Sequence, residues 1–140
     1  MILVSACLAG EKCAYDGESR LNPRVKDLEC IAMCPEVLGG RSIPRTKAEI
    51  KDGTGKDVLE GKAKAFDENG LDVTEQFIKG AFVALEIAKK YDVKEAILKS
   101  RSPSCGVGKI YDGSFDKKVV DGDGVTTALL KKAGIECRSI

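Results

Sequence analysis

The stretch KEAILKSRSPSCG, residues 94–106, joins a short apolar run to a turn that contains a proline, several hydroxyl groups and a cysteine. The run has the length of a β-strand, and the residues after it are typical of a loop. Two other stretches have the same order, because ILVSACLAG (2–10) and CIAMCPEVLGG (30–40) also place a cysteine where an apolar run ends. The sequence therefore predicts three strands that each lead into a cysteine-bearing turn.

Helical patterns alternate with these runs. The clearest covers residues 74–91, where an apolar stripe recurs at intervals of four, four and three residues, and it consists of Phe77, Ala81, Leu85 and Ala88. Shorter helices are expected at 23–28, opened by Asn22 as N-cap, and at 122–133. A last strand is expected at 135–138.

Alternating strands and helices indicate an α/β fold. We expect a single-domain, three-layer, Rossmann-like arrangement with a mostly parallel sheet. The polar, turn-rich residues 41–72 are expected to add a β-hairpin or a long excursion over one end of that sheet.

Length and charge limit the class of protein. With 140 residues the chain is long enough for one hydrophobic core, so we expect one domain over residues 1–140. The 23 basic and 22 acidic residues give a net charge of +1, which provides no general attraction to nucleic acid or to an anionic membrane. The N-terminal MILV has neither a basic leader nor a long apolar stretch, which predicts no signal peptide, no membrane span and a cytoplasmic location.

The cysteines are the candidates for chemistry, because a reducing compartment disfavours disulfides. The carboxyl ends of parallel strands meet at one edge of a sheet, so the three turns are expected to bring Cys7, Cys34 and Cys105 together. The chain has no histidine, and converging thiolates then favour a soft metal, either zinc or an iron-sulfur cluster. A zinc ion would take Cys13 as its fourth ligand.

Five motifs together resemble the small bacterial family catalogued as domain of unknown function 523, whose characterised members are iron-sulfur-dependent thiouracil desulfidases. They run in order over nearly the whole chain, and the resemblance is to the short, single-domain form, since larger desulfidases carry a further C-terminal domain. The motifs are VSACLAGEKCAYDG (4–17), CPEVLGG (34–40) followed by PRTKAEI (44–50), GLDVTEQFIKGA (70–81), AILKSRSPSCG (96–106) and YDGSF (111–115) with GDGVTTALL (122–130).

The resemblance implies the roles of several residues. It implies that Cys7, Cys34 and Cys105 hold a 4Fe-4S cluster and that Cys13 is not a required ligand. It also implies that Glu36 and Ser102 form the acid/base pair of a non-redox reaction that converts C=S to C=O and releases sulfide. From the residues alone, Glu36 would equally suit the start of a helix and Ser102 a turn.

Other polar residues are expected to contact the substrate. Ser104 and Arg101 lie in the same turn as Ser102, and the backbone amides of residues 104–106 and of the helix start near Gly124 are expected to stabilise negative charge. Asp16 and Asp112 each occur in a YDG sequence. These two aspartates are either substrate contacts or turn residues.

Two other functional classes fit the residues. One is a zinc-binding structural or interaction module that uses four cysteines, and the other is a metal-free thiol redox or sulfur-carrier protein with one cysteine of low pKa. The expected partner of the enzyme is a thiolated base or nucleoside rather than a membrane. Near-neutral charge argues against a large RNA, although a thiolated tRNA stays open, and an edge strand or a helix face would allow a homodimer.

Overall fold

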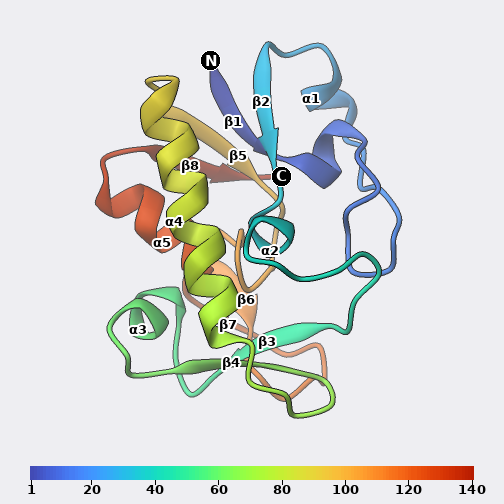
Figure 1. Cartoon of the computed structure of the whole chain (residues 1–140), viewed down its shortest axis with the longest axis vertical. Helices are drawn as coiled ribbons and strands as arrows, with labels where there is room; N and C mark the ends of the chain where they lie inside the picture. Colours follow the sequence, from blue (N-terminus) through green and yellow to red (C-terminus); the bar gives the residue numbers. More distant parts are fainter.

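A computed structural model describes residues 1–140. Its centre is a sheet with the strand order β2-β1-β5-β8, in which every neighbouring pair is parallel (Figure 1). In chain order, these strands are β1 Ile2–Ser5, β2 Cys30–Met33, β5 Glu95–Leu98 and β8 Glu136–Ser139. Each strand lies close to its predicted run, so the predicted α/β fold with a mostly parallel sheet is confirmed.

Helices cover both faces of this sheet. α4 (Thr74–Lys90) and α5 (Val125–Lys132) pack over one face, and the 3-10 helix η1 (Ala6–Ala9) and α1 (Pro23–Lys26) lie over the other (Figure 1). The predicted apolar stripe of α4 is confirmed, because all four of its residues are buried. The Asn22 side chain accepts a hydrogen bond from the first turn of α1, as predicted for an N-cap.

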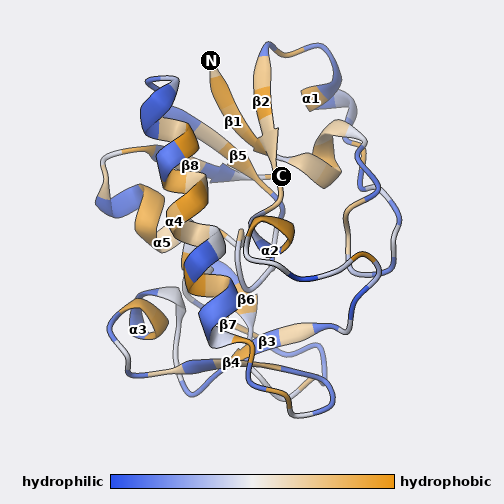
Figure 2. Ribbon diagram, viewed as in Figure 1, coloured by the Kyte–Doolittle hydropathy of each residue, from blue (hydrophilic) through white to orange (hydrophobic).

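The side chains of the strands serve two cores. Leu3 is fully buried in the larger core, which contains side chains of α4 and α5. The next residue, Val4, is buried in a smaller cluster with Leu8 of η1 and Val25 of α1. Successive strand residues point to opposite faces of a sheet, so the three layers follow from this alternation. Figure 2 shows β1 and β2 as mostly hydrophobic strands.

Two antiparallel pairs extend beyond the central sheet. The predicted hairpin is present as β3 (Ala48–Lys51) paired with β4 (Lys64–Asp67), but a short helix, α3 (Gly55–Leu59), lies between the two strands and was not predicted. The pair β6 (Lys109–Tyr111) and β7 (Val119–Asp121) was also missed. These strands have three residues each, which is too short to show a periodic pattern in the sequence.

A close helix contact fixes the segment that follows β2. There the chain forms α2 (Pro35–Leu38), which packs against α4. A Cβ atom on Gly80 of α4 would lie 1.9 Å from the carbonyl oxygen of Pro35, and one on Gly39 would lie 2.0 Å from the carbonyl oxygen of Gln76. Only glycine at these positions allows the two backbones to approach so closely.

Replacing Gly80 by alanine is expected to lower the free energy of unfolding by about 3 kcal/mol, because the added methyl group forces α2 and α4 apart. This cost exceeds the roughly 1 kcal/mol that alanine gains over glycine in a helix. Urea unfolding followed by circular dichroism measures the change, with Lys79→Ala on the exposed side of the same turn as the control. A Gly80→Ala protein as stable as this control would contradict the contact.

The topology places three chain segments at one edge of the sheet. The carboxyl ends of the parallel strands β1, β2 and β5 face the same edge, and η1, α2 and residues 99–106 continue from them. None of the helices combines the length and apolarity that a membrane span requires.

Candidate functional site

The three predicted thiols line one cavity at the carboxyl edge of the sheet. Its volume is about 520 Å³, within the range of small-molecule sites, which is on the order of 300–1,000 Å³. Cys7 lies in η1, Cys34 is the N-cap of α2, and Cys105 lies in the turn after β5. The charges of Cys105 and Cys34 both act to raise the pKa of Cys7, so the thiols are close enough to influence one another. The structure thus brings together the residues that the strand order predicted to meet.

The donor set fits a cluster better than a single ion. No group of three or more cysteine or carboxylate side chains is arranged to hold one metal ion, whereas a structural zinc needs four donors around one point. In an iron-sulfur cluster each cysteine binds a different iron atom, so its thiolates are spread around the cluster instead of meeting at one point. A cavity lined by thiols from three different chain segments meets that requirement.

Cys13 is a fourth thiol in the lining of the cavity. It is buried, and Cys34 Sγ donates a hydrogen bond to its carbonyl oxygen at 3.9 Å. The hydrogen bond from Cys34 lowers the pKa of Cys13, but the hydrogen bond to Cys7 and burial outweigh it and raise this pKa to about 11. Cys13 therefore lies beside two proposed ligands as a protonated thiol.

The remaining thiols differ in their ease of ionisation. The hydrogen bond with Cys13 lowers the pKa of Cys7, whereas the hydrogen bond with Cys13 and burial raise the pKa of Cys34. Burial raises the pKa of Cys105 to about 12, against opposing hydrogen bonds from Ser5 and Ser104. The raised pKa values disfavour the thiolate forms of Cys34 and Cys105, so neither thiol suits free nucleophilic chemistry.

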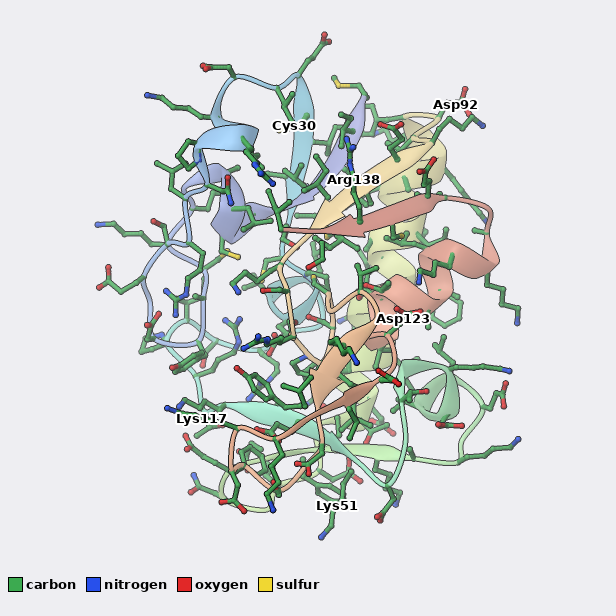
Figure 3. All side chains as sticks on the ribbon, turned by 180° about the vertical axis from the view of Figure 1, so that it is seen from behind. Cys30, Lys51, Asp92, Lys117, Asp123 and Arg138 are labelled. Carbon is green, nitrogen blue, oxygen red and sulfur yellow. The ribbon has the colours of Figure 1, made fainter.

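The other two cysteines lie outside this cavity. Cys30 is the first residue of β2, at the opposite end of that strand from Cys34 (Figure 3). It packs against the smaller core cluster, and Cys137 packs against the larger one. Burial raises the pKa of Cys137 to about 11. Both residues fill space as small apolar side chains.

Glu36 lies in the first turn of α2, and its side chain also faces the cavity. One carboxylate oxygen, Oε1, accepts hydrogen bonds from Arg41 Nη1 at 2.8 Å and from Arg45 Nε at 3.2 Å. The side chains of both arginines are less than a tenth exposed, and that of Glu36 is 14% exposed. The two cations compensate the buried charge and orient the carboxylate, which leaves the other oxygen, Oε2, free for chemistry.

The two arginines were missed as members of the site. Arg45 also donates to the carbonyl oxygen of Cys13 at 2.9 Å, and its other terminal nitrogen lies 4.0 Å from Cys34 Sγ. Arg41 donates to Thr46 as well. The only signal in the sequence was the position of Arg45 in the PRTKAEI motif, which did not indicate its partner.

Ser102 and Ser104 lie between Glu36 and Cys105. The two hydroxyl oxygens are 2.9 Å apart, and Ser104 Oγ is 3.5 Å from Glu36 Oε2 and 3.7 Å from Cys105 Sγ. Ser102 Oγ accepts hydrogen bonds from the backbone N–H groups of Ser104 and Cys105. Ser102 therefore holds the turn that presents Cys105 while its side chain lines the cavity.

Arg101 lines the cavity beside these serines, but Asp16 and Asp112 do not. Asp16 accepts hydrogen bonds from Arg20 and from the backbone of Glu18, and Asp112 accepts from Ser114. These local bonds correspond to the turn role that the sequence left open for both aspartates.

Aromatic residues next to these turns reach the cavity, although the sequence did not indicate that they would. Tyr15, Tyr111 and Phe115 line it, together with Lys117. Figure 3 labels Lys117 in the β6–β7 loop. Arg101, Phe115 and Lys117 have φ angles of 63°, 61° and 61°. Such left-handed backbone conformations are unfavourable for these residue types and are concentrated at functional sites.

The expected role of the backbone amides was wrong. The N–H groups at the start of α5 donate to carbonyl oxygens of the Pro103–Gly106 turn, including Gly124 to Gly106 and Val125 to Pro103. In the turn itself, the amide of Gly106 donates to the carbonyl oxygen of Ser102. Since Ser102 Oγ takes the amides of Ser104 and Cys105, none of these donors is free for a substrate.

A second, smaller cavity of about 330 Å³ lies beside β3 and β4. Its lining is mostly acidic and aromatic and contains neither a cysteine nor a serine. The cavity of the three thiols is therefore the candidate site.

The chain is similar to known proteins over nearly its whole length. The model of a family described as 2-thiouracil desulfurase matches residues 2–139. The uncharacterized protein YbbK of Bacillus subtilis (strain 168) is 49% identical over 138 residues, which cover 96% of this chain and 91% of that protein. The solved structure of the 4Fe-4S-dependent thiouracil desulfidase TudS (DUF523Vcz) has a TM-score of 0.87 at 40% identity, and the match covers 99% of this chain and 89% of that chain.

Proposed function

Because the chain belongs to the 2-thiouracil desulfurase family, we propose that it is an enzyme that replaces the sulfur of a small thiocarbonyl compound, such as thiouracil, by oxygen. The observation that carries this proposal is one cavity whose lining includes the thiols of Cys7, Cys34 and Cys105 together with Glu36 and Ser102. The reaction consumes one water, converts C=S to C=O and releases sulfide, so it needs no oxidant or reductant. The proposed location of this single domain is the cytoplasm.

The cofactor in this proposal is a 4Fe-4S cluster held by Cys7, Cys34 and Cys105. With three cysteine ligands, such a cluster offers one iron atom that can bind a soft sulfur atom as a Lewis acid. The neighbouring Arg45 and Lys99 supply positive charge next to the thiolates. This charge helps to hold an anionic set of ligands in a buried place.

Glu36 is the proposed general base. Its Oε2 faces the serines and the cavity, while Oε1 is held by Arg41 and Arg45. A carboxylate fixed in this way can take a proton from a water that attacks the thiocarbonyl carbon. The arginines prevent the side chain from turning away from that water.

Ser102 is the proposed proton donor to the substrate. The two backbone N–H groups that point at its Oγ favour the negative charge that builds up when Ser102 gives its proton away. Arg101, beside it, is proposed to contact polar groups of the substrate. The rings of Tyr15 and Tyr111 provide apolar faces on which a planar base can stack.

Cluster-loaded protein, prepared without air, is expected to convert 2-thiouracil to uracil and to release one sulfide per uracil formed. Chromatography of the bases and a sulfide assay measure the two products. Protein stripped of its cluster is expected to be inactive, whereas an active stripped protein would favour a thiol mechanism at Cys7 instead. Failure of the loaded enzyme on thiouracil, on thiolated nucleosides and on thiolated tRNA would overturn the proposed function.

A further inference from the structure

The hydrogen bonds of the Ser102 hydroxyl fix the direction of a proton path. A hydroxyl group has one proton to donate and two lone pairs that accept. Both lone pairs of Ser102 Oγ are engaged, by the N–H groups of Ser104 at 3.1 Å and of Cys105 at 3.0 Å. In the 2.9 Å contact between the two serine hydroxyls, Ser102 is therefore the donor and Ser104 the acceptor.

Ser104 has its own proton left to donate. Ser104 is 2% exposed, and the acceptors within reach of its hydroxyl are Glu36 Oε2 at 3.5 Å and Cys105 Sγ at 3.7 Å. A carboxylate is the stronger acceptor, and Oε2 is the oxygen that Arg41 and Arg45 leave free. The separation of 3.5 Å is the outer limit of a hydrogen bond and can shorten when substrate binds.

We propose that Ser104 relays a proton between Glu36 and Ser102, a role that rests on the proposed desulfidase reaction. Ser104 is buried and within hydrogen-bond distance of both partners, so it acts through them. Glu36 and Ser102 are otherwise not hydrogen-bonded to each other. Without Ser104, the base and the proton donor would work as separate groups.

The relay reverses its direction during the reaction. In the resting site, Ser102 donates to Ser104 and Ser104 donates to the Glu36 carboxylate. When Glu36 Oε2 takes a proton from the attacking water, the carboxylic acid becomes the donor. One of the two N–H bonds to Ser102 Oγ opens, so that Ser102 can turn its proton to the substrate and accept another from Ser104. The O–H bond on Glu36 then breaks as one forms on Ser104, Ser104 passes its own proton to Ser102, and Ser102 passes its own to the substrate sulfur, which leaves as hydrosulfide when the carbon–sulfur bond breaks. The hydroxyl proton of the water adduct goes to solvent as the C=O bond forms. Both serines end as neutral hydroxyls and Glu36 as a carboxylate.

The test compares variants at equal iron content, with thiouracil as substrate. Ser104→Ala is expected to lower kcat on the order of 10²-fold, the lower end of acid/base effects, and to leave KM within about twofold. The exposed Ser139→Ala on β8 is the control for loss of a hydroxyl elsewhere. Where alanine costs stability, Ser104→Thr retains the hydroxyl and is expected to keep kcat within about tenfold of the wild type.

Two readouts separate a relay from a merely structural serine. The double variant Ser102→Ala/Ser104→Ala is expected to be no slower than the slower single variant, because both changes break one path. Imidazole buffer, at constant pH, is expected to speed Ser104→Ala but not the wild type, since a small acid can replace the missing link. If the wild type is active, any one of three results would overturn the relay. These are an unchanged kcat in Ser104→Ala, losses of kcat that multiply in the double variant, and no rescue of Ser104→Ala by imidazole buffer. An inactive wild type would overturn the proposed function itself.

Discussion

Replacing Glu36 by glutamine is expected to lower kcat for desulfuration on the order of 10³-fold, with little change in KM. Glutamine has the shape of glutamate, and its amide oxygen can still accept the hydrogen bonds of Arg41 and Arg45. Its amide nitrogen, in the place of Oε2, cannot accept a proton from water. Steady-state rates of uracil formation, divided by the iron content of each preparation, measure the effect.

The control for this variant is Glu75→Gln, the same change on the exposed first turn of α4. Because Glu36 also compensates two buried arginines, its replacement is expected to cost some stability. For that reason the unfolding midpoint is measured next to the rate. A folded, iron-loaded Glu36→Gln enzyme with at least half of the wild-type kcat would exclude Glu36 as the base.

Replacing any one of Cys7, Cys34 or Cys105 by serine is expected to lower the bound iron from about four atoms per chain to less than about one. The hydroxyl of serine is a much poorer ligand for iron-sulfur clusters than a thiolate, and each of these residues binds a different iron atom in the proposed site. Anaerobic iron analysis and the brown absorbance of the cluster report the loss.

Replacing Cys30 or Cys137 by serine is the matched control, since both cysteines pack against apolar clusters and neither lines the cavity. Cys13→Ser distinguishes the two metal hypotheses. A cluster with three ligands is expected to survive this change, whereas a four-cysteine zinc site would lose its metal. Iron retention in the Cys34→Ser protein would be incompatible with the proposed ligand set.

The convergence of the thiols could be predicted because it depends on local signals. Each apolar run has the length of a strand, and each cysteine follows the carboxyl end of its run, so a parallel sheet alone brings Cys7 and Cys34 to one edge. The same reasoning applies to Cys105, whose turn after β5 is marked by Pro103.

The surroundings of Glu36 could not be predicted in the same way. Arg41 and Arg45 lie in a polar segment whose path depends on tertiary contacts, and nothing in their spacing indicates a shared carboxylate. The sequence did not show that the amides at the start of α5 already have hydrogen-bond acceptors. These acceptors, such as the carbonyl oxygen of Pro103, lie about twenty residues earlier in the chain. Short strands such as β6 are defined by pairing across a loop and not by their own composition.

Anaerobic determination of iron and acid-labile sulfide in the purified wild-type protein is the most direct test of the proposed centre at Cys7, Cys34 and Cys105. About four iron atoms and four sulfide ions per chain are expected, with the brown colour of a cluster that fades in air. A colourless protein that holds a single zinc ion, or one that binds no iron after reconstitution without oxygen, would contradict it.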